Sequence, residues 1–229
     1  MGQRSEIHKK KNWVMSIKNF GSGKMVTNRI DGSKNIPYRL IEQSDETDSL
    51  VIVLPGAGYT IQAPLLHFTT GVFYYKGFDV LHVNYQFSRQ EMAAINEKDF
   101  ASDVLQTIEN ATKDKKYCKY YVVAKSIGTI ALSNLQDHPT LKEAKLVWLT
   151  PLLQRSDVFN AMVRSENKGL CMIGDKDSCY IEERFEKLKN NQNLILNVVE
   201  GGNHSLELDN EPIKSIEILK NVISAINDF

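Results

Sequence analysis

Short apolar runs alternate with segments of helical periodicity along most of this chain. Phe100, Val104 and Ile108 recur at helical spacing in one segment, and a second apolar stripe follows Pro212 near the C-terminus. The members of that second stripe are Ile213, Ile216, Leu219, Ile223 and Ile226. Apolar residues at this spacing share one face of a helix, so we expect both stripes to lie in the core.

The apolar runs between the helical segments are short enough to be strands. We expect strands at about 36–43, 49–54, 78–84, 118–124, 145–150, 168–173 and 193–199. Strands that alternate with helices are typical of βαβ units, so the pattern predicts an α/β fold with a mostly parallel central sheet flanked by helices. The region before residue 49, with Thr27 to Ile30 and Pro37 to Ile41, is expected to supply an antiparallel edge.

The order of residues around Ser126 makes it a candidate nucleophile. The segment Ala124-Lys125-Ser126-Ile127-Gly128 lies between an apolar strand-like run and a helix-like segment from Thr129 to Leu135. A serine in so tight a strand-turn-helix projects above the sheet, and small flanking residues let the strand and the helix approach each other. The usual pattern is Gly-x-Ser-x-Gly, from which Ala124 departs. The competing interpretation is a serine that caps the helix.

A glycine-rich loop follows an earlier expected strand. The run 50–54 leads into Pro55-Gly56-Ala57-Gly58-Tyr59. Acyl transfer needs backbone N–H groups directed at the developing oxyanion, and glycine lets the backbone come close. We take the N–H groups of Ala57 and Ile127 as the candidate oxyanion donors; a plain glycine-rich turn is the competing interpretation.

Acidic residues and a histidine follow two later strands. Gly174-Asp175-Lys176-Asp177 comes after the run ending at residue 173, and Gly201-Gly202-Asn203-His204 comes after the run ending at residue 199. Histidine can take a hydroxyl proton near neutral pH while a carboxylate fixes its tautomer. The remaining histidines, His8, His67, His82 and His138, lack this setting, and we expect His82 to be a core residue.

The chain order of serine, acid and histidine, each placed after an expected strand, resembles the α/β-hydrolase superfamily. The resemblance covers roughly Val51 to the C-terminus. It implies a triad of Ser126, His204 and an acid at the last position of Gly-x-x-Asp, which is Asp177, with Asp175 as the alternative. Only residues 152–167 separate two of the strands, so a cap domain is expected to be minimal or missing.

The resemblance implies a serine hydrolase. We favour the hypothesis of a carboxylesterase-type enzyme that acts on small or exposed ester or acyl substrates. Tyr59, Tyr85 and Leu152 follow strand ends and are candidate substrate-binding residues, although packing would explain them equally well. Two alternatives stay open: a weakly active or inactive binding module of the same fold, and a thioesterase or peptidase.

Composition narrows the class of protein further. A hydrophobic content of 42% in 229 residues supplies one sizeable core, and no repeat or linker divides the chain. We expect a single domain over 1–229, with residues 1–12 as a flexible tail. The 28 basic and 28 acidic residues balance, so no nucleic-acid or membrane partner is expected.

Cysteine usage and motifs bear on compartment and cofactors. The three cysteines are odd in number and lack metal-ligand spacing, which favours a reducing compartment and no metal site. With no leader-like or membrane-spanning segment, we expect a cytoplasmic protein. No dinucleotide fingerprint follows a strand, so no cofactor is expected. The oligomeric state stays open, with a homodimer among the alternatives.

Overall fold

The computed structural model describes residues 25–26 and 36–229. The expected tail at 1–12 and the expected edge segment from Thr27 to Ile30 lie outside the described residues.

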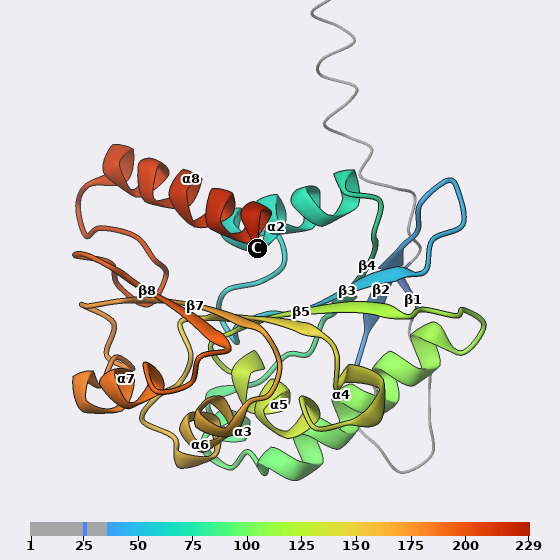
Figure 1. Ribbon diagram of the computed structural model, residues 1–229, viewed down its shortest axis with the longest axis horizontal. Coiled ribbons are helices and arrows are strands. Elements are labelled where there is room, and N and C mark those ends of the chain that lie inside the picture. Colours follow the sequence, from blue (N-terminus) through green and yellow to red (C-terminus); the bar gives the residue numbers. More distant parts are fainter. Residues whose placement is uncertain (1–24, 27–35) are drawn as a thin grey trace, which may run out of the picture.

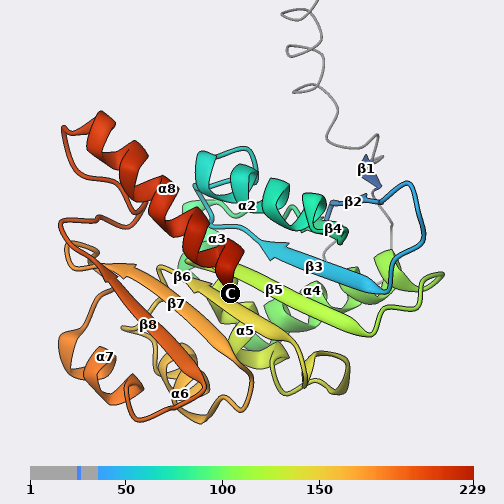
Figure 2. The ribbon, with the colours of Figure 1, turned by 45° about the horizontal axis from the view of Figure 1, so that its top comes forward.

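An eight-stranded sheet forms the centre of the described structure, in the order β1-β2-β4-β3-β5-β6-β7-β8 (Figure 2). The bounds are β1 Met25–Val26, β2 Tyr38–Ile41, β3 Ser49–Leu54, β4 Asp79–Val83, β5 Lys119–Lys125, β6 Lys145–Leu149, β7 Gly169–Gly174 and β8 Leu194–Val199. Strands β3 to β8 run parallel, whereas β1 and β2 add an antiparallel edge next to β4. The mostly parallel sheet with an antiparallel edge is therefore confirmed, and each expected strand lies within two residues of its predicted bounds.

Helices cover both faces of the sheet (Figure 1). One face carries α2 (Pro64–Tyr75) and α8 (Pro212–Asp228). The other face carries α3 (Arg89–Ala93), α4 (Glu97–Thr112), α5 (Gly128–Leu135), α6 (Ser156–Arg164) and α7 (Glu182–Leu188). The connection between β6 and β7 contains α6 and no inserted domain, as predicted. No helix among the described residues is long and apolar enough to cross a membrane.

The core consists of two layers because side chains alternate across the strands. In β5, Val122 and Ala124 pack with α4, α5 and α6, whereas Tyr121 and Val123 pack with α2 and α8. The expected helix stripe of Phe100, Val104 and Ile108 is buried in the first of these layers, as predicted. Both faces of the central strands are therefore dry, which explains their unbroken apolar runs.

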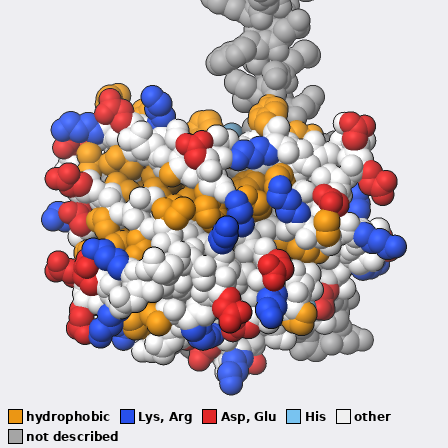
Figure 3. Space-filling model, viewed as in Figure 1, with side chains coloured by type: hydrophobic (Ala, Val, Ile, Leu, Met, Phe, Trp, Pro, Cys, Tyr) orange, Lys and Arg blue, Asp and Glu red, His pale blue; other side chains and the backbone are white. Residues whose placement is uncertain are grey.

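The prediction that the whole apolar stripe of α8 belongs to the core is wrong for its first half. Ile226 is fully buried, but Ile213 is 71% exposed and Ile216 is 61% exposed. Periodicity shows which residues share a helix face, but it does not show how far the surface beneath the helix extends. Hydrophobic side chains gather in a band across the face of the molecule seen in Figure 3. Ile195 and Val198 of β8 are exposed as well.

The first turn of α5 lies against the end of β3. A Cβ atom placed on Gly128 would lie 2.5 Å from the Leu54 carbonyl oxygen and 2.8 Å from the Tyr85 hydroxyl oxygen. Both distances are far below van der Waals contact, and the first involves backbone that cannot rotate away. Glycine is therefore required at this position for the strand and helix to approach each other.

We predict that Gly128→Ala destabilises the fold by about 1–3 kcal/mol, the usual cost of forcing an extra methyl into a packed site. Urea unfolding followed by circular dichroism measures the change. Gly58→Ala is the matched control, because a Cβ at Gly58 meets no heavy atom within 4 Å. Equal stabilities of the two variants would contradict the role of Gly128 in close packing.

His82 is a core residue, as predicted, and is 5% exposed in β4. The Thr70 hydroxyl donates to the Leu66 carbonyl at 2.9 Å, so it accepts a hydrogen bond from His82 Nε2, also at 2.9 Å. Burial, followed by the charges of Arg39 and His67, lowers the pKa of His82 from 6.5 to about 3. The imidazole is therefore neutral in the folded protein over the physiological range.

Because the unfolded chain protonates His82 near pH 6.5 and the folded chain only near pH 3, acid favours unfolding within this window. We predict that the unfolding free energy of the wild type falls as the pH drops from 6.5. The unfolding free energy of His82→Gln should fall less steeply, because glutamine keeps a donor but does not titrate. The difference in slope is at most about 1.4 kcal/mol per pH unit. Urea titrations at pH 4 to 7 measure it, and identical slopes would show that His82 does not contribute.

Candidate active site

Ser126 occupies a strained turn between β5 and α5. Its φ is 52°, a left-handed conformation that a serine rarely adopts. The Ser126 N–H donates to the Leu149 carbonyl at 3.0 Å, and the Thr129 N–H and hydroxyl donate to the Ser126 carbonyl at 2.9 and 2.6 Å. These bonds from β6 and α5 hold the turn, and Ser126 stays partly exposed at the end of β5.

The structure brings His204 and Asp177 to this serine. His204 Nε2 lies 2.8 Å from Ser126 Oγ, while His204 Nδ1 lies 2.9 and 2.8 Å from the two carboxylate oxygens of Asp177. The imidazole is 39% exposed and the carboxylate is fully buried. The hydroxyl, imidazole and carboxylate thus form one hydrogen-bonded chain, through which a proton can pass from serine to histidine.

The two aspartates after β7 have different partners. Asp177 contacts His204, whereas Asp175 Oδ1 accepts a hydrogen bond from the Gly201 N–H at 2.7 Å. Asp175 therefore ties the end of β7 to the loop that carries the histidine. The two loops also touch directly, since a Cβ on Gly174 would lie 1.8 Å from the Gly202 carbonyl oxygen.

Opposing influences act on the pKa of Asp177. Burial would raise it, but the hydrogen bonds from His204 and from the Cys179 N–H outweigh burial and lower the pKa below its usual value. The Cys179 N–H reaches Asp177 Oδ1 at 2.8 Å. The carboxylate is consequently charged at neutral pH and accepts the Nδ1 proton of His204.

The glycine-rich loop after β3 lies beside Ser126. A Cβ on Gly56 would be 3.5 Å from Ser126 Cβ. The Tyr85 hydroxyl donates to the Pro55 carbonyl and so holds the start of the loop in place. Among the described residues, the N–H groups of Ala57 and Ile127 donate to no protein acceptor, which leaves them available to a ligand.

The three candidate substrate-binding residues do not gather in one cavity. Tyr59 lines a cavity of about 440 Å³ between the loop 203–211 and the first turns of α2 and α8. Tyr85, only 6% exposed, borders a separate cavity of about 490 Å³ beside Phe87 and Phe100. Leu152 is half-buried, and its N–H donates to Thr129 Oγ1 at 3.4 Å. Ser126 lines neither of these two cavities.

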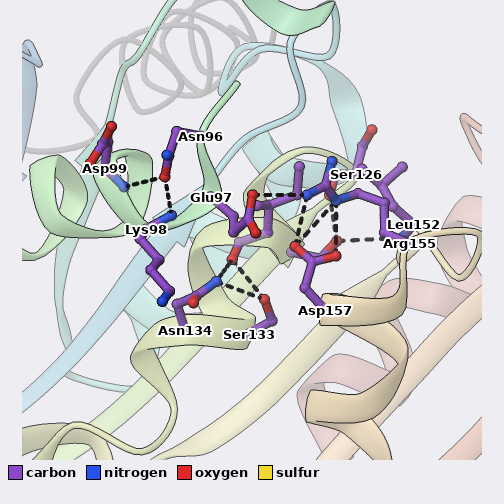
Figure 4. A network of polar contacts seen from close by, with 12 residues as sticks. Asn96, Glu97, Lys98, Asp99, Ser126, Ser133, Asn134, Leu152, Arg155 and Asp157 are labelled. Carbon is purple, nitrogen blue, oxygen red and sulfur yellow. Dashed lines mark hydrogen bonds and ion pairs between the residues drawn. The ribbon is translucent and has the colours of Figure 1, made fainter. Parts of the chain in front are cut away.

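Polar contacts around the first turn of α5 extend the support of Ser126 to α6 (Figure 4). Leu152 bonds to Thr129, whose hydroxyl donates to the Ser126 carbonyl. A few residues on, Arg155 pairs with Asp157 through three hydrogen bonds of 2.9 to 3.2 Å and reaches Glu97 at 3.5 Å. Sequence reasoning missed this network, because its members come from segments far apart in the chain.

Lys125, directly before Ser126, is a further residue that sequence reasoning missed. Its side chain is fully buried. Within β5 it falls in register with Tyr121 and Val123, which pack on the side of α2 and α8. A charged residue at an inward position of a buried strand is the signal that would have found it, because a buried charge requires dedicated partners.

Asp177, Cys179 and His204 offer three potential metal-ligand atoms within 4.8 Å of one another. The chemistry of this set does not favour a metal ion. Asp177 and His204 already hydrogen-bond to each other, and burial, followed by the charge of Asp177, raises the pKa of the Cys179 thiol. A metal requires the thiolate, which this setting disfavours. We therefore treat the set as a hydrogen-bonded chain and not as a metal centre.

No protein-family model matches the chain, and no curated protein sequence matches it. Solved structures, in contrast, are similar over nearly its whole length. Est1E from Butyrivibrio proteoclasticus superimposes with a TM-score of 0.69 at 15% identity, covering 91% of this chain and 97% of that chain. XC6422 from Xanthomonas campestris, an α/β serine hydrolase without a lid, gives 0.66 at 14% identity, covering 90% and 92%.

The esterase Pf2001 from Pyrococcus furiosus is similar as well, with a TM-score of 0.65 at 14% identity over 91% of this chain and 93% of that chain. At such identities a likeness speaks for the fold and leaves the chemistry to the site itself. The sheet order, the helices on both faces and these neighbours agree: the chain has the α/β-hydrolase fold.

Proposed function

We propose that this chain is a serine hydrolase of the carboxylesterase type, working by acyl transfer through Ser126, His204 and Asp177. The observation that carries the proposal is the continuous hydrogen-bonded chain from Ser126 Oγ through the His204 ring to the buried Asp177 carboxylate. Each member comes from the carboxyl end of a different parallel strand, which is where α/β folds place their reacting groups.

In the proposed reaction, Ser126 Oγ attacks the carbonyl carbon of an ester while His204 Nε2 takes the hydroxyl proton. The tetrahedral intermediate collapses when His204 returns that proton to the leaving alcohol, which leaves an acyl group on Ser126. A water molecule then gives a proton to His204 and attacks the acyl carbon. As this second intermediate collapses, His204 returns the proton to Ser126 Oγ, which releases the acid and restores the serine. Asp177 holds the imidazole tautomer and stabilises the imidazolium.

The N–H groups of Ala57 and Ile127 stabilise the oxyanion in this mechanism. Two features support them: the loop of Ala57 lies beside Ser126, and neither N–H has a protein acceptor among the described residues. Donors fixed in advance cost no reorganisation when charge develops on the substrate oxygen.

Small or exposed esters are the proposed substrates. The His204 imidazole is 39% exposed, and residues 150–168 contribute one helix and no inserted domain above the site. Among the structural neighbours, Est1E has been solved with ferulic acid bound, Pf2001 is an esterase, and XC6422 lacks a lid. An open site of this kind binds a short acyl group without enclosing a long chain.

We predict that a fluorophosphonate probe adds one mass increment to the wild type and none to Ser126→Ala, because only an activated serine attacks phosphorus. Intact-mass spectrometry measures the label. Hydrolysis of p-nitrophenyl acetate should fall on the order of 10⁶-fold in the same variant. A folded wild-type protein that is not labelled would sink the proposal and leave a binding module of the same fold.

We predict that Asp177→Asn lowers the turnover of the same ester by about 10⁴-fold, since an amide favours the wrong tautomer of His204. Asp175→Asn is the matched control two residues away, whose partner is a backbone N–H. It should keep most of the activity. Equal losses in both variants would contradict the assignment of Asp177 as the triad acid.

A further inference from the structure

The Lys125 ammonium lies at the junction of three strand ends. Its Nζ donates to Thr150 Oγ1 at 2.8 Å and to the His204 carbonyl at 2.7 Å. The third side of the ammonium faces the ring of Tyr59, with 4.6 Å from Nζ to the ring centroid. Two oxygens and an aromatic face therefore satisfy the three N–H groups of one fully buried cation.

The bond to His204 is the important one for the site. Among the described residues, it is the one hydrogen bond that the His204 main chain makes. The surrounding loop turns sharply, with positive φ angles at Gly201, Leu206 and Asn210. Without Lys125, the peptide that carries the imidazole would rest only on side-chain contacts and on its neighbours in the loop.

A core position filled by a lysine requires a reason. Lys125 falls in register with Tyr121 and Val123, where an apolar side chain would pack without desolvating a charge. Replacing buried polar groups by apolar residues of similar size is often neutral or stabilising. Stability therefore does not account for a lysine here, whereas a strong donor aimed at the His204 carbonyl does.

We propose that Lys125 is a positioning residue for the reaction proposed above: it anchors the His204 main chain from beneath, so that Nε2 stays in reach of Ser126 Oγ. The role belongs to the free enzyme and needs no contact between Lys125 and the substrate. Thr150, at the end of β6, fixes the ammonium in turn.

The charge of the anchor is sensitive to pH. Burial lowers the pKa of Lys125 from 10.5 to about 8, against the opposing charges of Asp177, Cys179 and Glu207. The other groups that face the ammonium titrate higher, since burial raises the pKa of Tyr59 and of Cys179. Above pH 8 a neutral amine replaces a charge-assisted donor, which roughly halves the strength of its hydrogen bonds.

The test measures the second-order rate of fluorophosphonate labelling of Ser126 from pH 6 to 10 in the wild type and in Lys125→Met. We expect a wild-type rate that declines with a midpoint near pH 8. Lys125→Met should label about 10- to 100-fold more slowly at pH 7, because His204 would no longer be held in its productive position. The labelling rate of this variant should also lack the decline near pH 8.

Lys145→Met is the matched control. Lys145 also bonds a carbonyl oxygen, that of Phe229 at 2.6 Å, and lies over the rings of Tyr121 and Phe229, but at the opposite end of β6. It should label as the wild type does. Melting curves of all three proteins separate loss of folding from loss of positioning.

The outcomes distinguish this proposal from the one on which it rests. No labelling of the folded wild type at any pH would overturn the proposed function and this inference with it. If the wild type is labelled and Lys125→Met has the same labelling rate and pH profile, the inference about Lys125 is overturned and the proposed function stands. If Lys125→Met fails to fold, the wild-type profile decides, because a flat rate between pH 7 and 9 would contradict the role of the ammonium.

Discussion

The site depends on the turn at Ser126, where the chain leaves β5 in a left-handed conformation and enters α5. Such a conformation costs about 1–3 kcal/mol, and it persists because the neighbouring structure leaves no alternative. The Leu149 carbonyl holds the serine N–H from one side and Thr129 holds its carbonyl from the other. Glycine at position 128 lets the first turn of α5 lie directly against the Leu54 carbonyl, since a Cβ there would be 2.5 Å from its oxygen. One turn thereby sets the position of the hydroxyl and of the first turn of α5.

The parallel arrangement of the strands places the other two side chains of the site near this turn. Strands β5, β7 and β8 end at the same edge, so the residues after them meet without any long connection. The contact between Gly174 and Gly202 brings the loops after β7 and β8 together, and the Lys125 ammonium ties the second loop back to β5. The hydroxyl, imidazole and carboxylate are therefore held by the ends of three strands, by the close contact of two loops and by the buried Lys125 side chain.

The sequence predicts the strands well because most are apolar runs bounded by glycine, proline or charged residues, and both faces of the central strands are dry. It also predicts which loops meet, since parallel strands end together. It does not separate Asp175 from Asp177, because both follow β7 and the turn decides which carboxylate faces His204. The exposure of Ile213 depends on where the surface under α8 ends, and Lys125 has partners 25 and 79 residues away. Neither follows from local periodicity.

The contact between Gly174 and Gly202 has a consequence for how such a protein changes over time. Since a Cβ at Gly174 would lie 1.8 Å from the Gly202 carbonyl oxygen, the segments that carry Asp177 and His204 leave no room between them for a side chain, and a change in one has to fit the other. A recombination event that joined one parent's loop after β7 to another parent's loop after β8 would bring together surfaces that had never been fitted.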